Sequence, residues 1–203
     1  MLDIFKIVVF ILSVVIHEVS HGVMANSLGD STAKDLGRIT LNPFKHIDIF
    51  GSVILPLMLL LTNVGFIFGY AKPVPYNPAN LRDKKYGPAK VAFAGPASNI
   101  ILAIVFGILL RFMPDIFASP LIPQLFLYIV WINLALAIFN LFPIPPLDCH
   151  WLLMAILPDR LQAVKIFLYR YSIVLFLALL FFIGPILSAI VFSLMSLLTG
   201  IRL

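Results

Sequence analysis

The sequence has few charged residues. Asp, Glu, Lys and Arg make up only 11% of its 203 residues, whereas apolar residues make up 62%. A typical soluble domain has about 25% charged residues. The mean hydropathy is +1.08, and a soluble globule of this size has too little interior to bury so many apolar side chains. The composition excludes a soluble enzyme, a disordered chain and a nucleic-acid-binding module, and it indicates an integral protein of the lipid bilayer.

Cysteine and long polar segments are also scarce. Cys149 is the only cysteine, which excludes a disulfide framework within the chain and a metal cluster built from several cysteines. The N-terminus lacks a basic region and a small-residue cleavage site, so we expect a retained first helix rather than a signal peptide. We find no repeat and no appended soluble domain. We therefore expect one transmembrane domain over residues 1–203.

Five apolar stretches are each close to the roughly 20 residues that a helix needs to cross a membrane. They run over residues 4–28, 49–70, 91–112, 125–142 and 171–198. We expect an all-α polytopic membrane protein with about four full transmembrane helices. The second stretch contains Pro56 among several glycines and is predicted to be a re-entrant or broken segment. The basic segment before the last stretch is expected at the membrane surface.

A short motif with two histidines lies inside the first apolar stretch. His17, Glu18 and His21 form the pattern HExxH, and positions i and i+4 of a helix share one face, so the two imidazoles converge. Two histidines, a third ligand and an open water position make a catalytic zinc site, with the glutamate as general base. Coincidence is the alternative, but burying three ionisable groups without partners in a membrane helix costs several kcal/mol. We therefore expect a metal site.

Asp148 is the candidate for the third ligand. The other aspartates lie at the ends of apolar stretches or in loops, whereas Asp148 lies between a proline-rich break at 143–146 and an apolar run at 151–153. A carboxylate in such surroundings needs a cation or hydrogen-bond donors. Capping a helix over 149–157 is the alternative role, and the two roles are compatible.

Three separated motifs occur in order along the chain: HEVSH at 17–21, AGPASN at 94–99 and NLFPIPPLDCH at 140–150. Together they resemble the site-2 protease family of intramembrane zinc metalloproteases, peptidase family M50. Two further segments, GRITLNPFKHID at 37–48 and AKPVPYNP at 71–78, resemble its compact members without PDZ or CBS domains. The resemblance covers about residues 16–153.

This resemblance implies a function and a site. The protein would hydrolyse peptide bonds in or near transmembrane segments of membrane proteins, with a catalytic core at about 4–157, a C-terminal helix at about 171–198 and one Zn²⁺ per chain. The general base would be Glu18. The implied zinc ligands are His17, His21 and Asp148. Asn99 and Asn140 would lie near the substrate, where an amide N–H stabilises the oxyanion or binds substrate backbone, with interhelical hydrogen bonding as the alternative.

Cys149 and His150 depart from the family pattern, in which Gly follows the Asp. Cys149 is small enough to be tolerated there. We expect His150 on the helix surface near the cytoplasmic edge. A hydrogen bond to a ligand and competition for the metal are the alternatives for this bulkier residue.

The ligand positions constrain the membrane topology. If the first four stretches each crossed once, Asp148 would emerge on the face opposite His21, and the ligands could not meet. A re-entrant segment at about 49–70 removes this conflict. It also places eleven of the 14 Lys and Arg residues on one face, which the positive-inside rule assigns to the cytoplasm. We therefore expect an external N-terminus and an active site toward the cytoplasmic face.

Residues 37–43 have strand-like alternation and are bounded by Gly37 and Pro43. In the resembling family the matching stretch is a membrane-dipping β-hairpin, which we expect at about 36–46. An edge strand there would pair with an extended substrate. A plain interfacial loop is the alternative. His46 is expected to be an interfacial or hydrogen-bonded histidine rather than a fourth ligand.

Two other functions compete with proteolysis. The first is a catalytically impaired metal-binding relative that binds or chaperones membrane helices, against which the presence of Glu18 argues. The second is a transporter or channel, but the sequence has no repeated halves of the kind common in that class. The expected partners are transmembrane protein substrates and lipid, with no nucleic acid, and the expected location is a bacterial plasma membrane. The sequence does not specify the substrate, the regulator or the oligomeric state.

Overall fold

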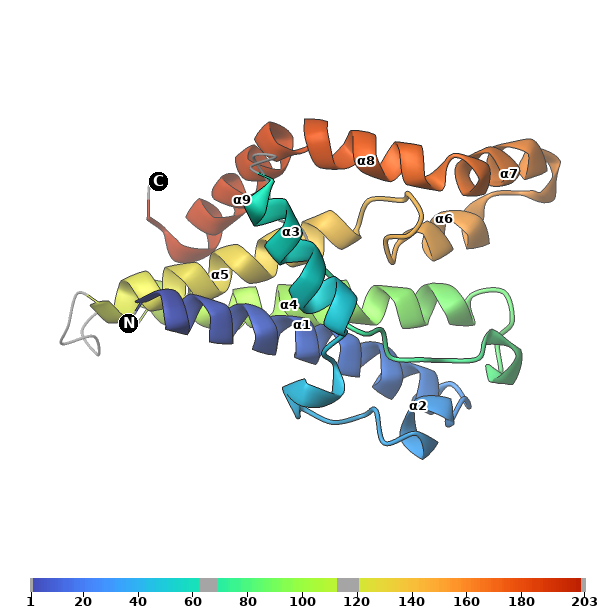
Figure 1. Cartoon of the computed structure of the whole chain (residues 1–203), viewed down its shortest axis with the longest axis horizontal. Coiled ribbons are helices and arrows are strands. Elements are labelled where there is room, and N and C mark those ends of the chain that lie inside the picture. Colours follow the sequence, from blue (N-terminus) through green and yellow to red (C-terminus); the bar gives the residue numbers. More distant parts are fainter. Residues whose placement is uncertain (1, 63–68, 113–120, 202–203) are drawn as a thin grey trace.

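The computed structural model describes residues 2–62, 69–112 and 121–201. Within this part of the chain the structure is helical and contains no β-strand (Figure 1). The longer helices are α1 (Leu2–Ser27), α4 (Gly87–Phe112), α5 (Leu121–Asn140), α8 (Ser172–Phe182) and α9 (Gly184–Thr199). The shorter helices are α2 (Thr32–Asp35), α3 (Leu55–Leu61), α6 (His150–Ile156) and α7 (Gln162–Arg170). The all-α fold class predicted from the sequence is therefore confirmed for the described residues.

Within the described residues, two or three helices are candidates for crossing a membrane. α4 and α5 are long and apolar enough to cross a membrane, and α7 with α8 makes a third candidate if this pair, bent by 70°, is one span. The prediction of about four full spans is not confirmed. The C-terminal helix predicted at about 171–198 consists of two helices, α8 and α9, and α9 begins at Gly184-Pro185, where the sequence interrupts this apolar stretch. Proline lacks the backbone N–H that would continue α8 and clashes with its preceding turn.

The helices α4, α5 and α9 share an apolar core. Its buried members are small or branched side chains: Ala103, Val130, Leu134, Val191 and Met195. α1 packs against α4 and α5 and runs beside them along the long axis of the molecule (Figure 1). Between α4 and α9 a small residue permits close approach, since a Cβ at Gly107 would lie only 3.0 Å from Leu198 Cβ.

Large apolar side chains cover the outside of the molecule. Ile4, Phe182 and Leu197 are each more than two-thirds exposed, at 69%, 77% and 68%. An exposed apolar surface of this extent is unfavourable in water and marks contact with a membrane. The chain is thus an integral membrane protein, as the composition predicts.

The segment predicted to be re-entrant begins and ends at one place. A π-helix (Ile49–Ile54) leads into α3. The Tyr70 N–H donates to the Gly51 carbonyl at 3.1 Å, and Ser52 Oγ donates to the Tyr70 carbonyl at 2.9 Å. The two ends of the segment therefore lie side by side, which is the geometry expected of a re-entrant segment. Residues 63–68 of this segment lie outside the described part.

The β-hairpin predicted at about 36–46 is not confirmed. These residues form turns and a 3₁₀ helix at Pro43–Lys45, whose first turn is capped by the Asn42 side chain. His46 is 2% exposed, and its Nε2–H donates to the Thr40 carbonyl at 2.8 Å. This bond closes the segment into a loop, so the alternating pattern does not find a strand partner. The prediction of a hydrogen-bonded His46 is confirmed.

Candidate metal centre

His17 and His21 lie one turn apart on the buried face of α1. They are 6% and 8% exposed, and their ring centroids are 4.7 Å apart at an interplanar angle of 85°. α1 continues without a break from Leu2 to Ser27, so the i, i+4 spacing directs both rings to one side.

Asp148 comes from the loop between α5 and α6, and its carboxylate meets both rings. Asp148 Oδ2 lies 2.8 Å from His17 Nε2 and 3.4 Å from His21 Nε2. The candidate ligand atoms of these three residues all lie within 4.8 Å of one another. The Cys149 N–H donates to the Asn140 carbonyl at 3.1 Å and ties the loop to the end of α5. Three residues predicted as ligands thus come together across a sequence separation of 131 positions.

Asp148 does not cap a helix. α6 begins at His150, and its N-cap position is occupied by Cys149 without a side-chain capping hydrogen bond. The capping role left open by the sequence is therefore wrong, and the Asp148 side chain is used at the histidines.

The hydrogen-bond partners of the two Nδ1 atoms determine which nitrogen of each ring carries a proton. His17 Nδ1–H donates to Asn99 Oδ1 at 2.6 Å, and His21 Nδ1–H donates to the Val91 carbonyl at 2.7 Å. A carbonyl oxygen only accepts, so each Nδ1 carries a proton, and a ring in its neutral form would present an Nε2 lone pair to Asp148. His21 Nε2 is buried and has no hydrogen-bond partner. Two lone pairs and a carboxylate oxygen repel one another unless a proton or a metal cation lies between them.

This donor set fits a zinc ion. Zinc binds histidine nitrogen and aspartate oxygen at about 2.0–2.2 Å, and ligand atoms at that radius in a tetrahedron lie about 3.3 Å apart. The 3.4 Å between His21 Nε2 and Asp148 Oδ2 matches this edge, whereas the 2.8 Å between His17 Nε2 and Asp148 Oδ2 is shorter. The buried, unpartnered Nε2 of His21 is the strongest sign that the site takes a cation. His17, His21 and Asp148 would hold it.

Gly95 of α4 provides the space in which the two rings meet. A Cβ at this position would lie 2.5 Å from both His17 Nε2 and His21 Nε2. Any side chain would therefore collide with the metal-binding atoms. The motif at 94–99 lies inside α4, with Pro96 buried, because α4 already begins at Gly87.

Asn99 lies behind His17 in a network of buried amides. It is 0% exposed, and its Nδ2 donates to Asn133 Oδ1 at 2.8 Å and to the Ser13 carbonyl at 3.3 Å. Asn133 Nδ2 in turn donates to Ser13 Oγ at 3.0 Å. These bonds fix the Asn99 amide so that its oxygen faces His17. The predicted substrate contact of Asn99 stays a prediction, and the alternative of interhelical hydrogen bonding is what the structure shows.

Glu18 meets an extended segment that we call the strap, residues 72–77. Glu18 Oε2 accepts a hydrogen bond from the Val74 N–H at 2.8 Å. Arg38 Nη2 donates to the carbonyls of Lys72 and Pro73 at 2.9 and 3.3 Å. The Lys72 N–H also donates to the His46 carbonyl at 2.8 Å. The strap is therefore held on several sides where it passes Glu18.

Asp30 anchors the far end of the strap. Its carboxylate is 0% exposed and accepts from the Asn77 N–H at 2.7 Å, from Thr32 Oγ1 at 2.6 Å and from Asn80 Nδ2 at 2.9 Å. Burial raises the pKa of Asp30, but the hydrogen bonds from Thr32, Asn77 and Asn80 outweigh it and hold the pKa below its ordinary value. The ionised carboxylate thus holds the turn after α1 and the strap together.

The remaining predicted residues lie close by in sequence but have other partners. Asn140 Nδ2 donates to the Leu136 carbonyl within α5 at 3.0 Å. His150 is 8% exposed, and its Nδ1–H donates to the Leu147 carbonyl at 2.6 Å, so its predicted place on the helix surface is wrong. Cys149 is buried and free. Neither belongs to the group formed by the two histidines and Asp148.

Two known proteins have sequences similar to that of this chain. Over 198 residues the chain is 32% identical to "Putative zinc metalloprotease YwhC" of Bacillus subtilis (strain 168), an alignment that covers 95% of this chain and 86% of that protein. A protein-family model described as "Peptidase family M50" matches residues 115–182 of this chain. The chain belongs to peptidase family M50. It is also 30% identical over 144 residues to "Putative zinc metalloprotease Rip2" of Mycolicibacterium smegmatis, over 68% of this chain and 52% of that protein. No solved structure matches the chain significantly.

Sequence reasoning missed several residues of this M50 site. Asn133 is visible as an amide between apolar residues in the middle of α5, a pattern that indicates a buried partner. The carbonyl of Val91 and the N–H of Val74 carry no side-chain signal at all. The Tyr76 hydroxyl is buried without a hydrogen-bond partner, and burial, followed by the negative charge of Asp148, raises the pKa of Tyr76 to about 12.

Proposed function

We propose that this M50 protein is an intramembrane zinc metalloprotease that hydrolyses peptide bonds in or near the transmembrane segments of other membrane proteins. The observation that carries the proposal is the meeting of His17 Nε2, His21 Nε2 and Asp148 Oδ2 next to Glu18 in a helix with an apolar, exposed N-terminal half. Ionisable groups at such depth are costly unless they serve a function. Both named relatives are bacterial proteins, and we propose a bacterial plasma membrane for this one.

A bound zinc ion would supply Lewis acidity, which activates a water molecule and polarises the scissile carbonyl. Glu18 takes the proton of the attacking water and returns it to the leaving amine. The Val74 N–H donates a hydrogen bond to Glu18 Oε2, which limits rotation of the Glu18 side chain. Glu18 therefore begins the reaction with its carboxyl group held in a fixed direction.

The groups behind the ligands keep the rings ready for the metal. Asn99 and the Val91 carbonyl hold the Nδ1 protons, so that both rings offer Nε2. Gly95 keeps side chains out of the space between them. We assign Asn99 a positioning role toward His17. Contact with the substrate is the second possible role, and the variants N99A and N140A distinguish the two.

Substrate geometry imposes one further requirement. A transmembrane helix satisfies its backbone hydrogen bonds internally, so its peptide bonds are accessible only after local unwinding. We expect helix-destabilising residues near the cut to speed cleavage. The charge distribution supports a cytoplasmic position for the site and an external N-terminus.

Proteolysis of a model transmembrane substrate by the full chain in proteoliposomes tests the proposal. Zinc-loaded protein should cleave the substrate, chelation should stop cleavage, and returned zinc should restore it. The E18Q variant should bind zinc and leave the substrate intact. Full zinc loading without cleavage of any substrate that contains a destabilised helix would favour the impaired, helix-binding relative.

A further inference from the structure

A pocket outside the metal centre is lined by lysines and apolar side chains. It has a volume of about 520 Å³ and lies between the turn before α4, the helix α6 and the helix α7. Lys84 and Lys85 come from the turn, Trp151 and Leu157 from the region of α6, and Lys165 from α7. Neither the zinc chemistry nor the substrate proposal uses this pocket.

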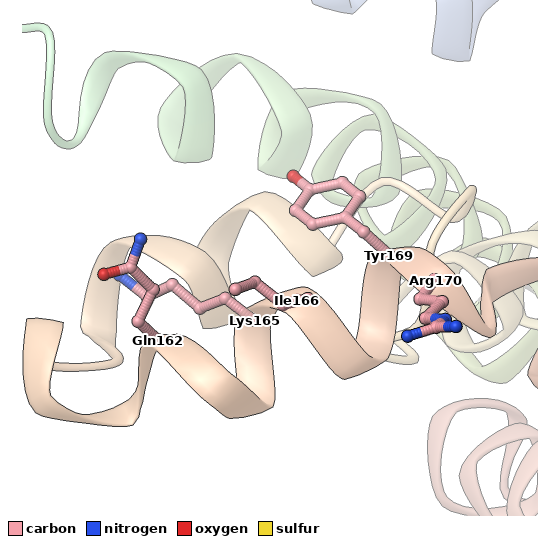
Figure 2. A pocket seen from close by; sticks show the side chains of 5 residues that line it. All are labelled: Gln162, Lys165, Ile166, Tyr169 and Arg170. Carbon is pink, nitrogen blue, oxygen red and sulfur yellow. The ribbon is translucent and has the colours of Figure 1, made fainter.

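A second pocket continues the basic surface along α7. Its volume is about 580 Å³, and it shares Lys165 with the first. Figure 2 shows that Gln162, Lys165, Tyr169 and Arg170 all come from one helix and are spread along its length. Tyr169 also contacts the His150 ring edge to face, with centroids 5.9 Å apart, which attaches α7 to α6.

The neighbouring helices indicate that these pockets lie at the level of the lipid headgroups. α4 and α5 are neighbouring candidate spans, so the start of α4 and the end of α5 lie at the same membrane face. The lysine-bearing turn directly precedes α4, and α6 follows α5 within ten residues. α7 is bent by 70° from the apolar α8, and its Ile166 and Phe167 are 58% and 51% exposed. A helix with basic and exposed apolar side chains at this angle lies in the membrane interface.

The charges around the first pocket favour an anion. Lys84 Nζ donates to the Ala79 carbonyl and retains further N–H donors. Lys85 Nζ lies 5.1 Å from the Tyr86 ring centroid and stays exposed. The neighbouring Asp83 carboxylate is already paired with Lys90 at 3.2 Å. Lysine ammoniums beside tryptophan and leucine suit a molecule with a phosphate at one end and acyl chains at the other.

We propose that this pocket binds the phosphate headgroup of an anionic phospholipid, and that the lipid fixes α6 and α7 at the membrane surface on the side of the metal centre. The proposal rests on membrane insertion and not on catalysis. The bound lipid would stabilise the position of α6, which begins two residues after Asp148.

The test uses the full chain in nanodiscs of phosphatidylcholine with a minority of phosphatidylglycerol. Native mass spectrometry measures how strongly phosphatidylglycerol is enriched among the retained lipids. The triple variant K84Q/K85Q/K165Q should lower this enrichment by at least about fivefold, since each lysine near an anionic surface contributes roughly that factor. The matched variant K34Q/K45Q/K72Q removes three exposed lysines outside the pocket and should leave the enrichment unchanged.

Each other outcome overturns the proposal. Equal losses in both triple variants would show diffuse attraction to charged lipid, and no loss in either would show that the pocket is unused. Displacement of the lipid by millimolar inorganic phosphate would show a site for free phosphate instead. K165E, which reverses the charge shared by both pockets, gives a second test should the triple variant unfold. Because E18Q should bind the lipid like the wild type, failure of lipid binding and failure of proteolysis are separable.

Discussion

The Val74 N–H donates a 2.8 Å hydrogen bond to the Glu18 carboxylate, across 56 positions of sequence. This bond joins the strap to the residue that takes the proton in the proposed reaction. Asp30 and Arg38 hold the same segment through separate hydrogen bonds to Asn77 and Lys72. Glu18 therefore has a structural role beside its chemical one, and the two roles can be measured separately.

Substituting Glu18 by Gln or by Ala separates these roles. Gln keeps an oxygen that accepts from Val74 but cannot take a proton, so E18Q should lose at least about 100-fold in cleavage rate while the strap stays protected. E18A should lose the same activity and also leave the Val74 N–H without its acceptor. Hydrogen exchange at Val74 measures the difference. Equal protection of Val74 in both variants would contradict a structural role for Glu18.

Gly95→Ala should weaken zinc binding. Its Cβ would lie 2.5 Å from both Nε2 atoms, so the rings must move and zinc affinity should fall by at least about tenfold. Gly184→Ala is the matched control, because a Cβ there meets nothing within 4 Å. Zinc content after dialysis against a weak chelator reports both. Wild-type zinc affinity in the alanine variant at 95 would contradict the close packing of α4 on the histidines.

Asn99→Ala and Asn140→Ala should behave differently. Loss of the Asn99 oxygen frees the His17 Nδ1 proton and should weaken zinc binding by about 10–100-fold. The Asn140 side chain donates its hydrogen bond to the Leu136 carbonyl within the same helix, so N140A should keep zinc. A fall in cleavage rate by N140A at full zinc occupancy would support the substrate contact predicted for Asn140. Unchanged zinc affinity in N99A would contradict the positioning role of Asn99.

Asp30→Asn should destabilise the protein in a pH-dependent manner. The pKa of Asp30 is lowered in the folded state, so its carboxylate stabilises the fold above the unfolded-state pKa of about 4 and loses this effect as the pH falls through the folded-state pKa. At pH 7 we expect a loss of about 1–3 kcal/mol, because four donors lose their charged acceptor. Thermal unfolding in detergent from pH 7 to pH 3 measures it.

The control for Asp30 is Asp35→Asn, which changes an exposed carboxylate in the same turn. Its unfolding temperature should follow the wild type at all pH values. The difference between wild type and D30N should shrink toward acid pH. A difference that grows toward acid pH would contradict the lowered pKa.

The sequence predicts the ligands because chemistry and periodicity agree. His17 and His21 share a helix face, and Asp148 is the one carboxylate set between apolar runs. The prediction of a re-entrant segment follows from the ligand positions, since the ligands could not otherwise reach one another. The two ends of this segment do meet, at Gly51 and Tyr70.

Other features could not be predicted, because they depend on packing rather than on side-chain type. The role of Gly95 requires the distance between α1 and α4, and that of Val74 requires the path of the strap. The alternating pattern at 37–43 resembles a strand, but a strand needs a partner, and His46 closes this segment into a loop. Gly184-Pro185 visibly interrupts the last apolar stretch, but the sequence does not decide between a kink and a new helix; the structure has a new helix, α9, that begins at Gly184.

X-ray absorption at the zinc edge, on the purified full chain, tests the central claim most directly. The wild type should hold one zinc per chain with only nitrogen and oxygen ligands, including two imidazoles, and D148A should lose the metal. A sulfur ligand from the adjacent Cys149, or zinc that is retained unchanged in D148A, would contradict a centre built from His17, His21 and Asp148.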